Sequence, residues 1–179
     1  EKENTIEKII LTASGGPFRK FKKSELINVS KEDALNHPKW KMGEKITIDS
    51  ASLMNKGLEV IEAKWLFNVK TSNIEVTIHP EAIVHSMVQF KDGSIKAQLR
   101  VPDMKIPIQF ALTSPKRIDS KFPRLSLNQK MNLNFEKPNL NIFKNLKLAY
   151  QAINEGGNKP CILNAANEIV VEAFLENKI

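Results

Sequence analysis

The chain contains 179 residues, of which 41% are hydrophobic and 26% are charged, and this balance excludes disordered and fibrous proteins. Its length allows one well-buried globular core with a modest appendage. No apolar run approaches the roughly 20 residues needed to cross a bilayer, and no signal peptide is recognisable near Glu1, so we expect a soluble protein without a membrane partner. The single cysteine, Cys161, excludes an internal disulfide and favours a reducing compartment.

The net charge of +7 is compatible with nucleic acid, an acidic membrane surface or a small anionic substrate. The 27 Lys and Arg residues are spread along the chain, with local concentrations only at 19–23 and 116–124. Such runs are typical of solvated faces, and one Tyr and two Trp offer few platforms for stacking bases. We therefore expect no nucleic-acid partner, and salt-dependent binding to unrelated DNA would be needed to support one.

The first elements are predicted to be a strand and a short helix. Residues 8–13 are apolar and β-prone, and they end at a Ser-Gly-Gly-Pro turn at 14–17, which indicates a buried strand followed by a tight turn. The polar stretch 24–35 predicts a short helix, in which Ser30 and Asp33 suit a capping box.

A loop, a short strand and a longer helix are expected next. Pro38 and Gly43 interrupt regular structure in 37–43, which indicates a draped or mobile loop. Residues 45–48 predict a short strand, and the helix that follows runs to about residue 67, with Asp49 or Ser50 as its cap. The helical spacing of its large apolar residues predicts the buried face: Met54, Leu58, Ile61 and Trp65.

The middle of the chain predicts three more strands, at 74–78, 87–90 and 94–99. Asp92-Gly93, placed between two apolar runs, is a strong signal for a hairpin. We therefore expect an α/β (α+β) domain with a mixed sheet flanked by helices.

The character changes in the last third, where Pro, Lys and Asn become frequent. We expect a catalytic domain at 1–113, a connector at 114–141, and the beginning of an α-helical C-terminal domain at 142–179. Helices are predicted at 146–155 and 164–176, separated by a Gly-Gly stop, and together they carry more apolar surface than two helices can bury.

A polar stripe on the predicted helix at 50–67 is the first candidate site. At about 100° per residue, Asn55 and Glu59 share one arc of the helix with Lys56 nearby, and Ser50 adds a hydroxyl at the amino end. Backbone N–H groups and the helix dipole favour an anion there, so the stripe suits a phosphate group, and Glu59 suits a hard cation. The alternative is an ordinary exposed helix face with a weak ion pair between Lys56 and Glu59.

Weaker signals surround this stripe. Gly57 costs helix stability and hints at close approach by another group, and the turn at Ser14 can place N–H groups around an anion or simply reverse the chain. The loop 37–43 suits a lid or a loop pinned to the core by Trp40. His79 and His85 have no ligand partner at a metal-binding spacing, so we expect neither to be a metal ligand.

Five ordered segments carry a family resemblance: LTASGGPFR at 11–19, HPKWKMG at 37–43, IDSASLMNKGLEVIEA at 48–63, IHPEAIVHSMV at 78–88 and LNAANE at 163–168. Together they span almost the whole chain and resemble the 1-deoxy-D-xylulose 5-phosphate reductoisomerase family. The resemblance implies an enzyme of the non-mevalonate isoprenoid pathway, which rearranges 1-deoxy-D-xylulose 5-phosphate and reduces the product with NADPH to 2-C-methyl-D-erythritol 4-phosphate. It also implies a homodimer, in bacterial cytoplasm or in a plastid-type organelle.

The resemblance also implies a role for each matching residue. The phosphate would be held by Ser14, Ser50, Asn55 and Lys56, while Glu59 would bind Mg²⁺ or Mn²⁺. His37 would contact the substrate from the lid, with cover from Trp40 and Met42. Gly43 would lie beside the nicotinamide and His85 near the site.

Two features of the family are missing from this sequence, the Asp-Ser-Glu motif that supplies the other metal ligands and the glycine-rich nucleotide-binding domain. A single carboxylate leaves most coordination positions of a hard cation to water. We therefore expect the isolated chain to be inactive and to bind divalent metal weakly. A non-catalytic phosphosugar-binding or oligomerisation module is the alternative.

Overall fold

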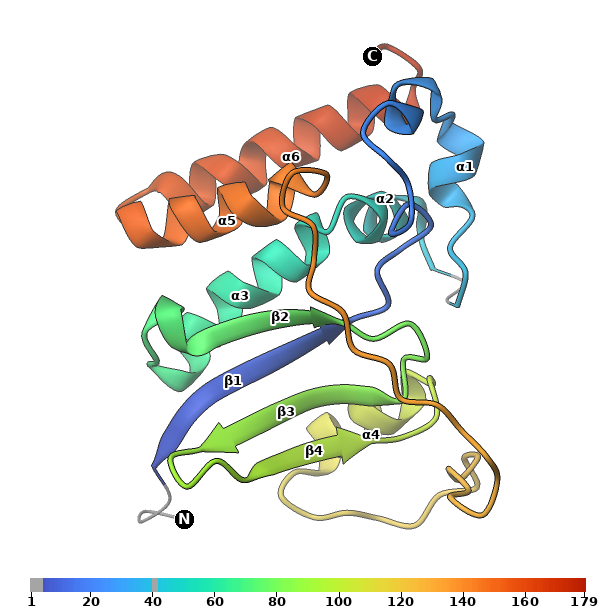
Figure 1. Cartoon of the computed structure of the whole chain (residues 1–179), viewed down its shortest axis with the longest axis vertical. Helices are drawn as coiled ribbons and strands as arrows, with labels where there is room; N and C mark the ends of the chain where they lie inside the picture. The colour runs from blue at the N-terminus through green and yellow to red at the C-terminus, as the bar shows by residue number, and fades with distance from the viewer. Residues whose placement is uncertain (1–4, 40–41) are drawn as a thin grey trace.

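The sheet of this protein is mixed, as predicted. The structure is a computed structural model that describes residues 5–39 and 42–179. Its four strands, in the spatial order β2-β1-β3-β4, are β1 (Ile6–Ala13), β2 (Ile74–Ile78), β3 (Val84–Phe90) and β4 (Ile95–Leu99). β1 is parallel to β2 and antiparallel to β3, and β3 and β4 form the antiparallel hairpin that Asp92-Gly93 predicts (Figure 1).

The parallel pair β1–β2 determines where the site lies. The two strands pair from Ile9 with Ile74 to Ala13 with Ile78, so their carboxyl ends meet at one edge of the sheet. Of the helices between them, α3 (Met54–Phe67) packs on the sheet, and the main core forms where apolar residues of β1, β2 and α3 meet Phe143 and Leu146. Loops at the carboxyl ends of parallel strands are the usual position of ligand sites in such sheets.

Residues 45–48 are helical, so the prediction of a strand there is wrong. They belong to α2 (Glu44–Ala51), which begins after Gly43, and the Thr47 hydroxyl donates to the Gly43 carbonyl at 2.8 Å. A run of four residues is too short for its periodicity to separate strand from helix. Burial around most of α2 decides the conformation, because the successive residues Thr47, Ile48 and Asp49 are all buried.

The longer helix begins at Met54, and neither Asp49 nor Ser50 caps it. Both residues belong to α2, and Leu53 separates α2 from α3 in the left-handed conformation, with φ 57° and ψ 17°. Its amide donates to the Ser50 carbonyl at 3.2 Å, which closes the corner between the two helices. Leucine rarely adopts this conformation, so local propensity could not predict the corner.

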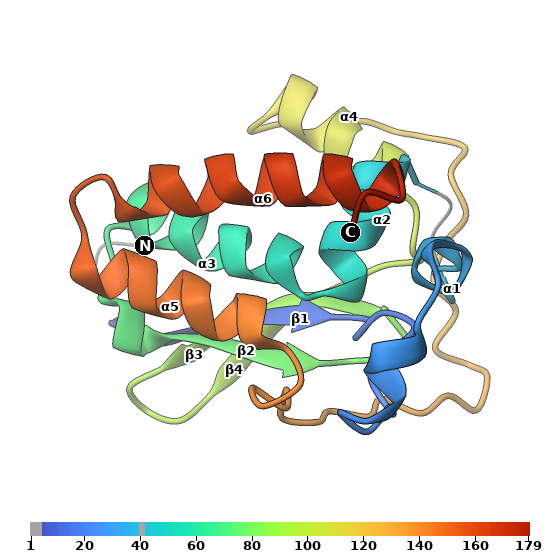
Figure 2. The same ribbon diagram turned by 90° about the horizontal axis from the view of Figure 1, so that it is seen from above.

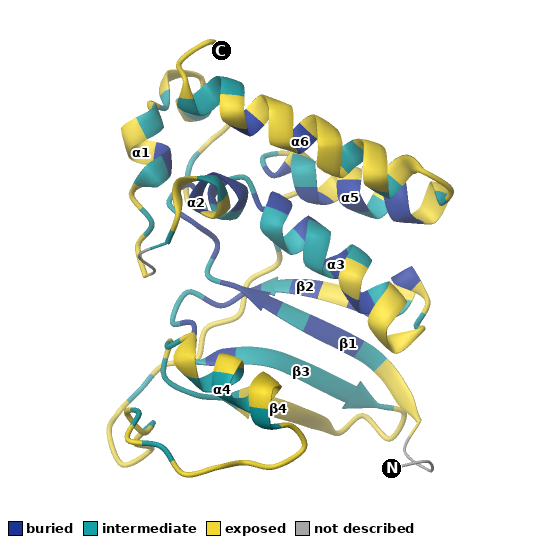
Figure 3. Ribbon diagram, turned by 180° about the vertical axis from the view of Figure 1, so that it is seen from behind, coloured by how far each residue is buried: buried dark blue, intermediate teal, exposed yellow. Residues whose placement is uncertain are grey.

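The buried face of α3 also differs from the prediction. Besides Met54 it consists of Gly57, Val60 and Ala63, whereas Trp65 is 68% exposed. Along α3, buried and exposed positions alternate (Figure 3). A Cβ atom on Gly57 would lie 2.6 Å from the Ala149 Cβ, so the glycine allows α5 (Lys144–Glu155) to approach closely. Small residues that face another helix, rather than large apolar ones, define the packed side, and helix packing explains Gly57 without a ligand.

The predicted strand at 8–13 and the capping box are confirmed, while the short helix predicted at 24–35 is divided into two pieces. A 3₁₀ turn, η1 (Glu25–Asn28), precedes α1 (Lys31–Leu35), and a second one, η2 (Thr71–Asn73), precedes β2. Ser30 and Asp33 form the capping box: the Ser30 hydroxyl accepts from the Asp33 amide at 3.1 Å, and the Ser30 amide donates to the Asp33 carboxylate at 3.0 Å.

Three helices follow β4. α4 (Lys105–Thr113) has no buried residue, and residues 114–141 follow it with a single bridge, from Glu136 to Ile78. α5 ends at Gly156, whose φ is 74°, and α6 (Lys159–Leu175) begins five residues earlier than 164 because Pro160 fits the first turn of a helix.

α3, α5 and α6 form layers above the β2 edge of the sheet, with α3 between the sheet and the α5–α6 pair (Figure 1). α2 contacts α6 (Figure 2). The outer faces of α5 and α6 expose large apolar side chains, including Leu148, Ile162 and Ile169. No helix within residues 5–39 and 42–179 is both long enough and apolar enough to cross a bilayer.

Candidate functional site

A cavity of about 560 Å³ lies at the carboxyl ends of β1 and β2. Its wall is built from the end of β1, the end of α2, the first turns of α3, the start of β3 and the end of β4. Most of the residues predicted as site residues line it: Ser14, Met42, Ser50, Asn55, Lys56, Glu59 and His85. Residues from distant parts of the sequence therefore meet at one cavity.

The polar stripe of α3 forms one wall of this cavity. Lys56 Nζ donates to Glu59 Oε2 at 2.6 Å, and Asn55 Nδ2 donates to Glu59 Oε1 at 2.9 Å. The Lys56 side chain is only 12% exposed, so this stripe is not an ordinary solvated helix face. Both donors lie in the first turn of α3, where backbone N–H groups and the helix dipole favour an anion.

His37 joins the cavity through Ser14. The Lys39 amide donates to His37 Nδ1 at 3.2 Å, so the neutral ring carries its proton on Nε2, which donates to Ser14 Oγ at 3.1 Å. Burial lowers the pKa of His37 below its ordinary value. A neutral imidazole is therefore favoured, and it links the predicted lid segment to the end of β1.

Two of the other predicted lid and cofactor residues, Met42 and Gly43, belong to the described part of the chain. Met42 lines the cavity. Gly43, the next residue, is the N-cap of α2, and no described atom beyond its chain neighbours lies within 4 Å of the position that a Cβ atom would take there. Trp40 lies outside the described residues.

His85 is a neutral residue of the cavity wall. Its Nε2 lies 3.3 Å from the Arg100 carbonyl, so Nε2 carries the proton in the neutral ring. Burial lowers the pKa of His85 to about 4, with a further contribution from the Arg100 charge. The lowered pKa favours the neutral ring at neutral pH, with an unprotonated Nδ1.

His79 has a structural role. It is fully buried, its Nδ1 donates to the Asn134 carbonyl at 2.8 Å, and its Nε2 accepts from the Ile83 amide at 3.2 Å. The ring also stacks on Phe135, with centroids 4.7 Å apart. Both ring nitrogens therefore fix the segment after β2, through the Asn134 carbonyl and the Ile83 amide.

Glu59 provides the one carboxylate among the described residues that line this cavity. Within the described part of the chain, no group of three or more His, Cys, Asp or Glu residues could hold a metal. Glu59 fits as one ligand, because its carboxylate lines the cavity and is oriented by Asn55 and Lys56. A complete site would need further ligands from outside the described residues.

Sequence reasoning missed two features of the site. Arg100, at the end of β4, lines the cavity, and no local motif marks it. Behind Ser50, the buried Asp49 accepts from Asn167 of α6 at 2.8 Å and from Lys45 at 2.7 Å. Asn167 belongs to the LNAANE segment, which carried the resemblance without indicating a role.

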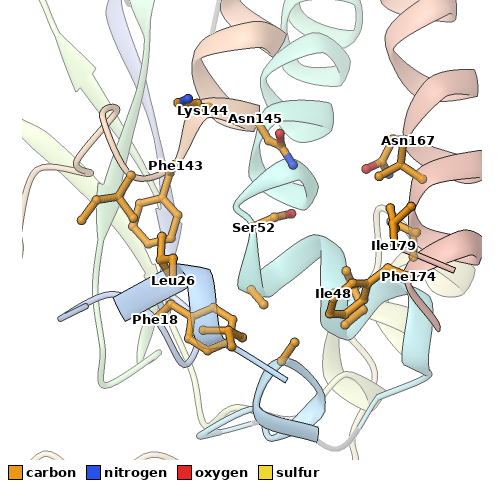
Figure 4. A pocket seen from close by; sticks show the side chains of 16 residues that line it. Phe18, Leu26, Ile48, Ser52, Phe143, Lys144, Asn145, Asn167, Phe174 and Ile179 are labelled. Atoms are coloured by element: carbon orange, nitrogen blue, oxygen red, sulfur yellow. The ribbon is translucent and has the colours of Figure 1, made fainter. Parts of the chain in front are cut away.

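A second cavity, of about 340 Å³, lies between α2, α6 and the segment before α5 (Figure 4). Its lining is mainly apolar and includes Phe18, Ile48 and Phe174, while Asn167 and Ser52 contribute polar groups at one side. This lining contains amide and ammonium groups, from Asn145, Asn167 and Lys144, but no carboxylate. The larger cavity brings a carboxylate, an amide and an ammonium group together on one helix, so it is the candidate site.

Comparison with known proteins identifies the family. Residues 1–67 match the 1-deoxy-D-xylulose 5-phosphate reductoisomerase C-terminal domain, and residues 99–179 match the DXP reductoisomerase C-terminal domain. The 1-deoxy-D-xylulose 5-phosphate reductoisomerase of Bacteroides fragilis is 61% identical over 176 residues, which is 98% of this chain. The chain belongs to the 1-deoxy-D-xylulose 5-phosphate reductoisomerase family. The reductoisomerase of Chloroherpeton thalassium is also 61% identical, over 97% of this chain.

Solved reductoisomerase structures share the fold. A crystal structure of DOX-P reductoisomerase in complex with NADPH, fosmidomycin and magnesium has a TM-score of 0.93 and 51% identity over 98% of this chain. The enzyme from Zymomonas mobilis in complex with NADPH has a TM-score of 0.90 and 45% identity. The chain spans less than half the length of these relatives: it covers 45% of the Bacteroides fragilis protein and 43% of the first of these structures.

Proposed function

We propose that the protein containing this chain converts 1-deoxy-D-xylulose 5-phosphate to 2-C-methyl-D-erythritol 4-phosphate with NADPH, as an oxidoreductase and isomerase of the non-mevalonate isoprenoid pathway. The carrying observation is that Asn55, Lys56 and Glu59 converge on one cavity with Ser14 and Ser50. This proposal is supported by relatives named as reductoisomerases and by related structures that hold NADPH and magnesium.

In this proposal the substrate phosphate lies at the amino end of α3. Asn55 and Lys56 donate hydrogen bonds to it, and the hydroxyls of Ser14 and Ser50 approach from β1 and α2. Because phosphate binding occurs away from the reacting carbons, it orients the substrate and contributes binding energy that favours the reactive geometry. Lys56 must then share its charge between Glu59 and the phosphate.

Glu59 is proposed as one ligand of Mg²⁺ or Mn²⁺. A bound divalent ion polarises the substrate ketone and stabilises negative charge on oxygen during the rearrangement. The part played by this chain is to orient the Glu59 carboxylate, which Asn55 and Lys56 hold from one side.

The lid residues are proposed to close over the substrate. His37 contacts the substrate from the rim, Met42 and Trp40 exclude water, and Gly43 lies beside the nicotinamide ring. His85, neutral at physiological pH, is proposed as a polar contact of the wall. Lids of this kind protect a reaction from water and complete the site on closure.

We propose residues 1–113 as the catalytic domain, 114–141 as the connector and 142–179 as the beginning of a helical C-terminal domain. The protein is proposed to be a cytoplasmic homodimer, and the isolated chain to be inactive. The exposed strand β4 and α4, which has no buried residue, offer an open surface for a second copy.

The test compares the full-length protein with the isolated chain. NADPH oxidation that depends on 1-deoxy-D-xylulose 5-phosphate and on Mg²⁺ or Mn²⁺ is expected only for the full-length protein, and Lys56→Gln should raise its KM for the phosphosugar. Turnover by the isolated chain would refute the proposal that this chain is inactive without the rest of the protein. Phosphosugar binding without turnover in the full-length protein would favour a non-catalytic module instead.

A further inference from the structure

Arg100 is a cationic residue of the cavity wall that has no place in the proposed set of substrate contacts. It lies at the end of β4, next to the start of β3, and it lines the same cavity as Lys56 and Glu59. Its charge acts on His85, and so does that of Lys56, which places both cations near one imidazole ring. The cationic side chains of the cavity wall therefore come from both α3 and the end of β4.

The backbone and the side chain of Arg100 are both held in place. Its amide donates to the Ile83 carbonyl at 3.1 Å, and its own carbonyl lies 3.3 Å from His85 Nε2. Nη1 donates to the Asp103 carbonyl at 2.6 Å. A half-buried guanidinium fixed in this way loses little further conformational freedom when it binds a ligand.

The Asp103 charge acts on Arg100, but within the described residues no carboxylate forms an ion pair with its guanidinium. The Lys56 ammonium forms an ion pair with Glu59, whereas the hydrogen bond described for the Arg100 guanidinium goes to a neutral carbonyl. The nearby Asp103 carboxylate accepts from the Lys105 amide at the start of α4. A guanidinium has several N–H donors in a fixed fork, and this fork matches the oxygens of a phosphoryl group.

We propose that Arg100 is a further anion-binding residue of this cavity and donates hydrogen bonds to phosphoryl oxygens of a bound ligand. The inference rests on the proposed function, because the phosphorylated sugar and the nicotinamide cofactor are the two sources of such oxygens. Arg100 and Lys56 then approach the ligands from opposite sides, β4 and α3.

The experiment uses the full-length protein and measures KM separately for 1-deoxy-D-xylulose 5-phosphate and for NADPH, together with the inhibition constant of inorganic phosphate. Arg100→Gln should raise one of the two KM values about tenfold or more, as expected for the loss of a charge-assisted hydrogen bond. Arg100→Lys keeps the charge without the fork and should raise it less. Lys96→Gln removes a cation from an exposed position of the same strand and should change neither value.

The two KM measurements show which ligand supplies the phosphoryl group. An increase confined to the sugar phosphate, with weaker inhibition by inorganic phosphate, indicates the substrate, and an increase confined to NADPH indicates the cofactor. If both KM values of Arg100→Gln and Arg100→Lys match the wild type while Lys56→Gln raises KM for the sugar, Arg100 only braces the loop to Asp103 and the inference fails. If Lys56→Gln also has no effect, the proposed phosphate site itself is wrong.

Discussion

Gly57→Ala is predicted to destabilise the protein, although alanine is the better helix former. The substitution alone would stabilise α3 by about 1 kcal/mol. The new Cβ, however, would lie 2.6 Å from the Ala149 Cβ, which is well inside the ordinary carbon–carbon contact of about 3.5–4.0 Å. Both atoms are attached directly to helix backbones, so α3 and α5 must move apart, at a cost of about 2–3 kcal/mol. We expect a net loss of about 1–2 kcal/mol.

The free energy of unfolding is measured by urea denaturation of wild type, Gly57→Ala, Ala149→Gly and the double variant. Ala149→Gly removes the clashing atom, so the double variant should be more stable than Gly57→Ala, with a coupling energy of about 2 kcal/mol or more. Asn154→Ala, on the exposed face of α5, controls for helix propensity and should stabilise by a few tenths of a kcal/mol. If Gly57→Ala stabilises the protein, or if the two sites are additive, the close approach of α3 and α5 is wrong.

Three further predictions concern the site and its support. Asn167→Ala should lower the free energy of unfolding by about 1.5–3 kcal/mol in urea denaturation, because it removes a hydrogen bond to the buried Asp49 carboxylate, whereas the exposed Asn164→Ala should have little effect. Glu59→Gln should reduce metal-dependent turnover of the full-length protein about 100-fold or more, and unchanged turnover would remove Glu59 from the metal site. Because the folded-state pKa of His85 is about 4 and its ordinary value is 6.5, the unfolded chain binds more protons between these values, so stability falls as pH decreases through this window. His85→Gln should reduce that fall by about 1–2 kcal/mol, allowing for solvent screening of a half-buried ring, and identical slopes for both proteins would contradict a lowered pKa of His85.

Local signals in the sequence predicted the elements that depend on local interactions. The capping box of Ser30 and Asp33 and the hairpin at Asp92-Gly93 are formed by residues close together in the chain, and both are present. The stop at Gly156 is of the same kind, because a positive φ suits glycine. These features need no knowledge of the tertiary fold.

Features imposed by tertiary packing could not be predicted in this way. The left-handed corner at Leu53 divides the predicted helix into α2 and α3, and it persists because Leu53 is 2% exposed within the core. The packed side of α3 follows Gly57 and Ala63 rather than Trp65, because close approach by α5 requires small side chains. Size and hydrophobicity alone therefore misplaced this face.

The candidate site was predicted to the extent that it is continuous in sequence. Asn55, Lys56 and Glu59 lie within two turns of one helix, and their spacing indicated a shared polar arc. Arg100 and the contact from Asn167 to Asp49 join segments that are far apart in the chain, so only the three-dimensional arrangement reveals them.

The most direct test of the central claim is a crystal structure of the full-length protein with 1-deoxy-D-xylulose 5-phosphate and Mg²⁺. We predict that the phosphate lies within hydrogen-bond distance of Lys56 Nζ and Asn55 Nδ2 at the amino end of α3, and that a Glu59 oxygen ligates the metal. A sugar phosphate bound elsewhere, with the pair Lys56 and Glu59 unchanged and remote from both ligands, would contradict the account.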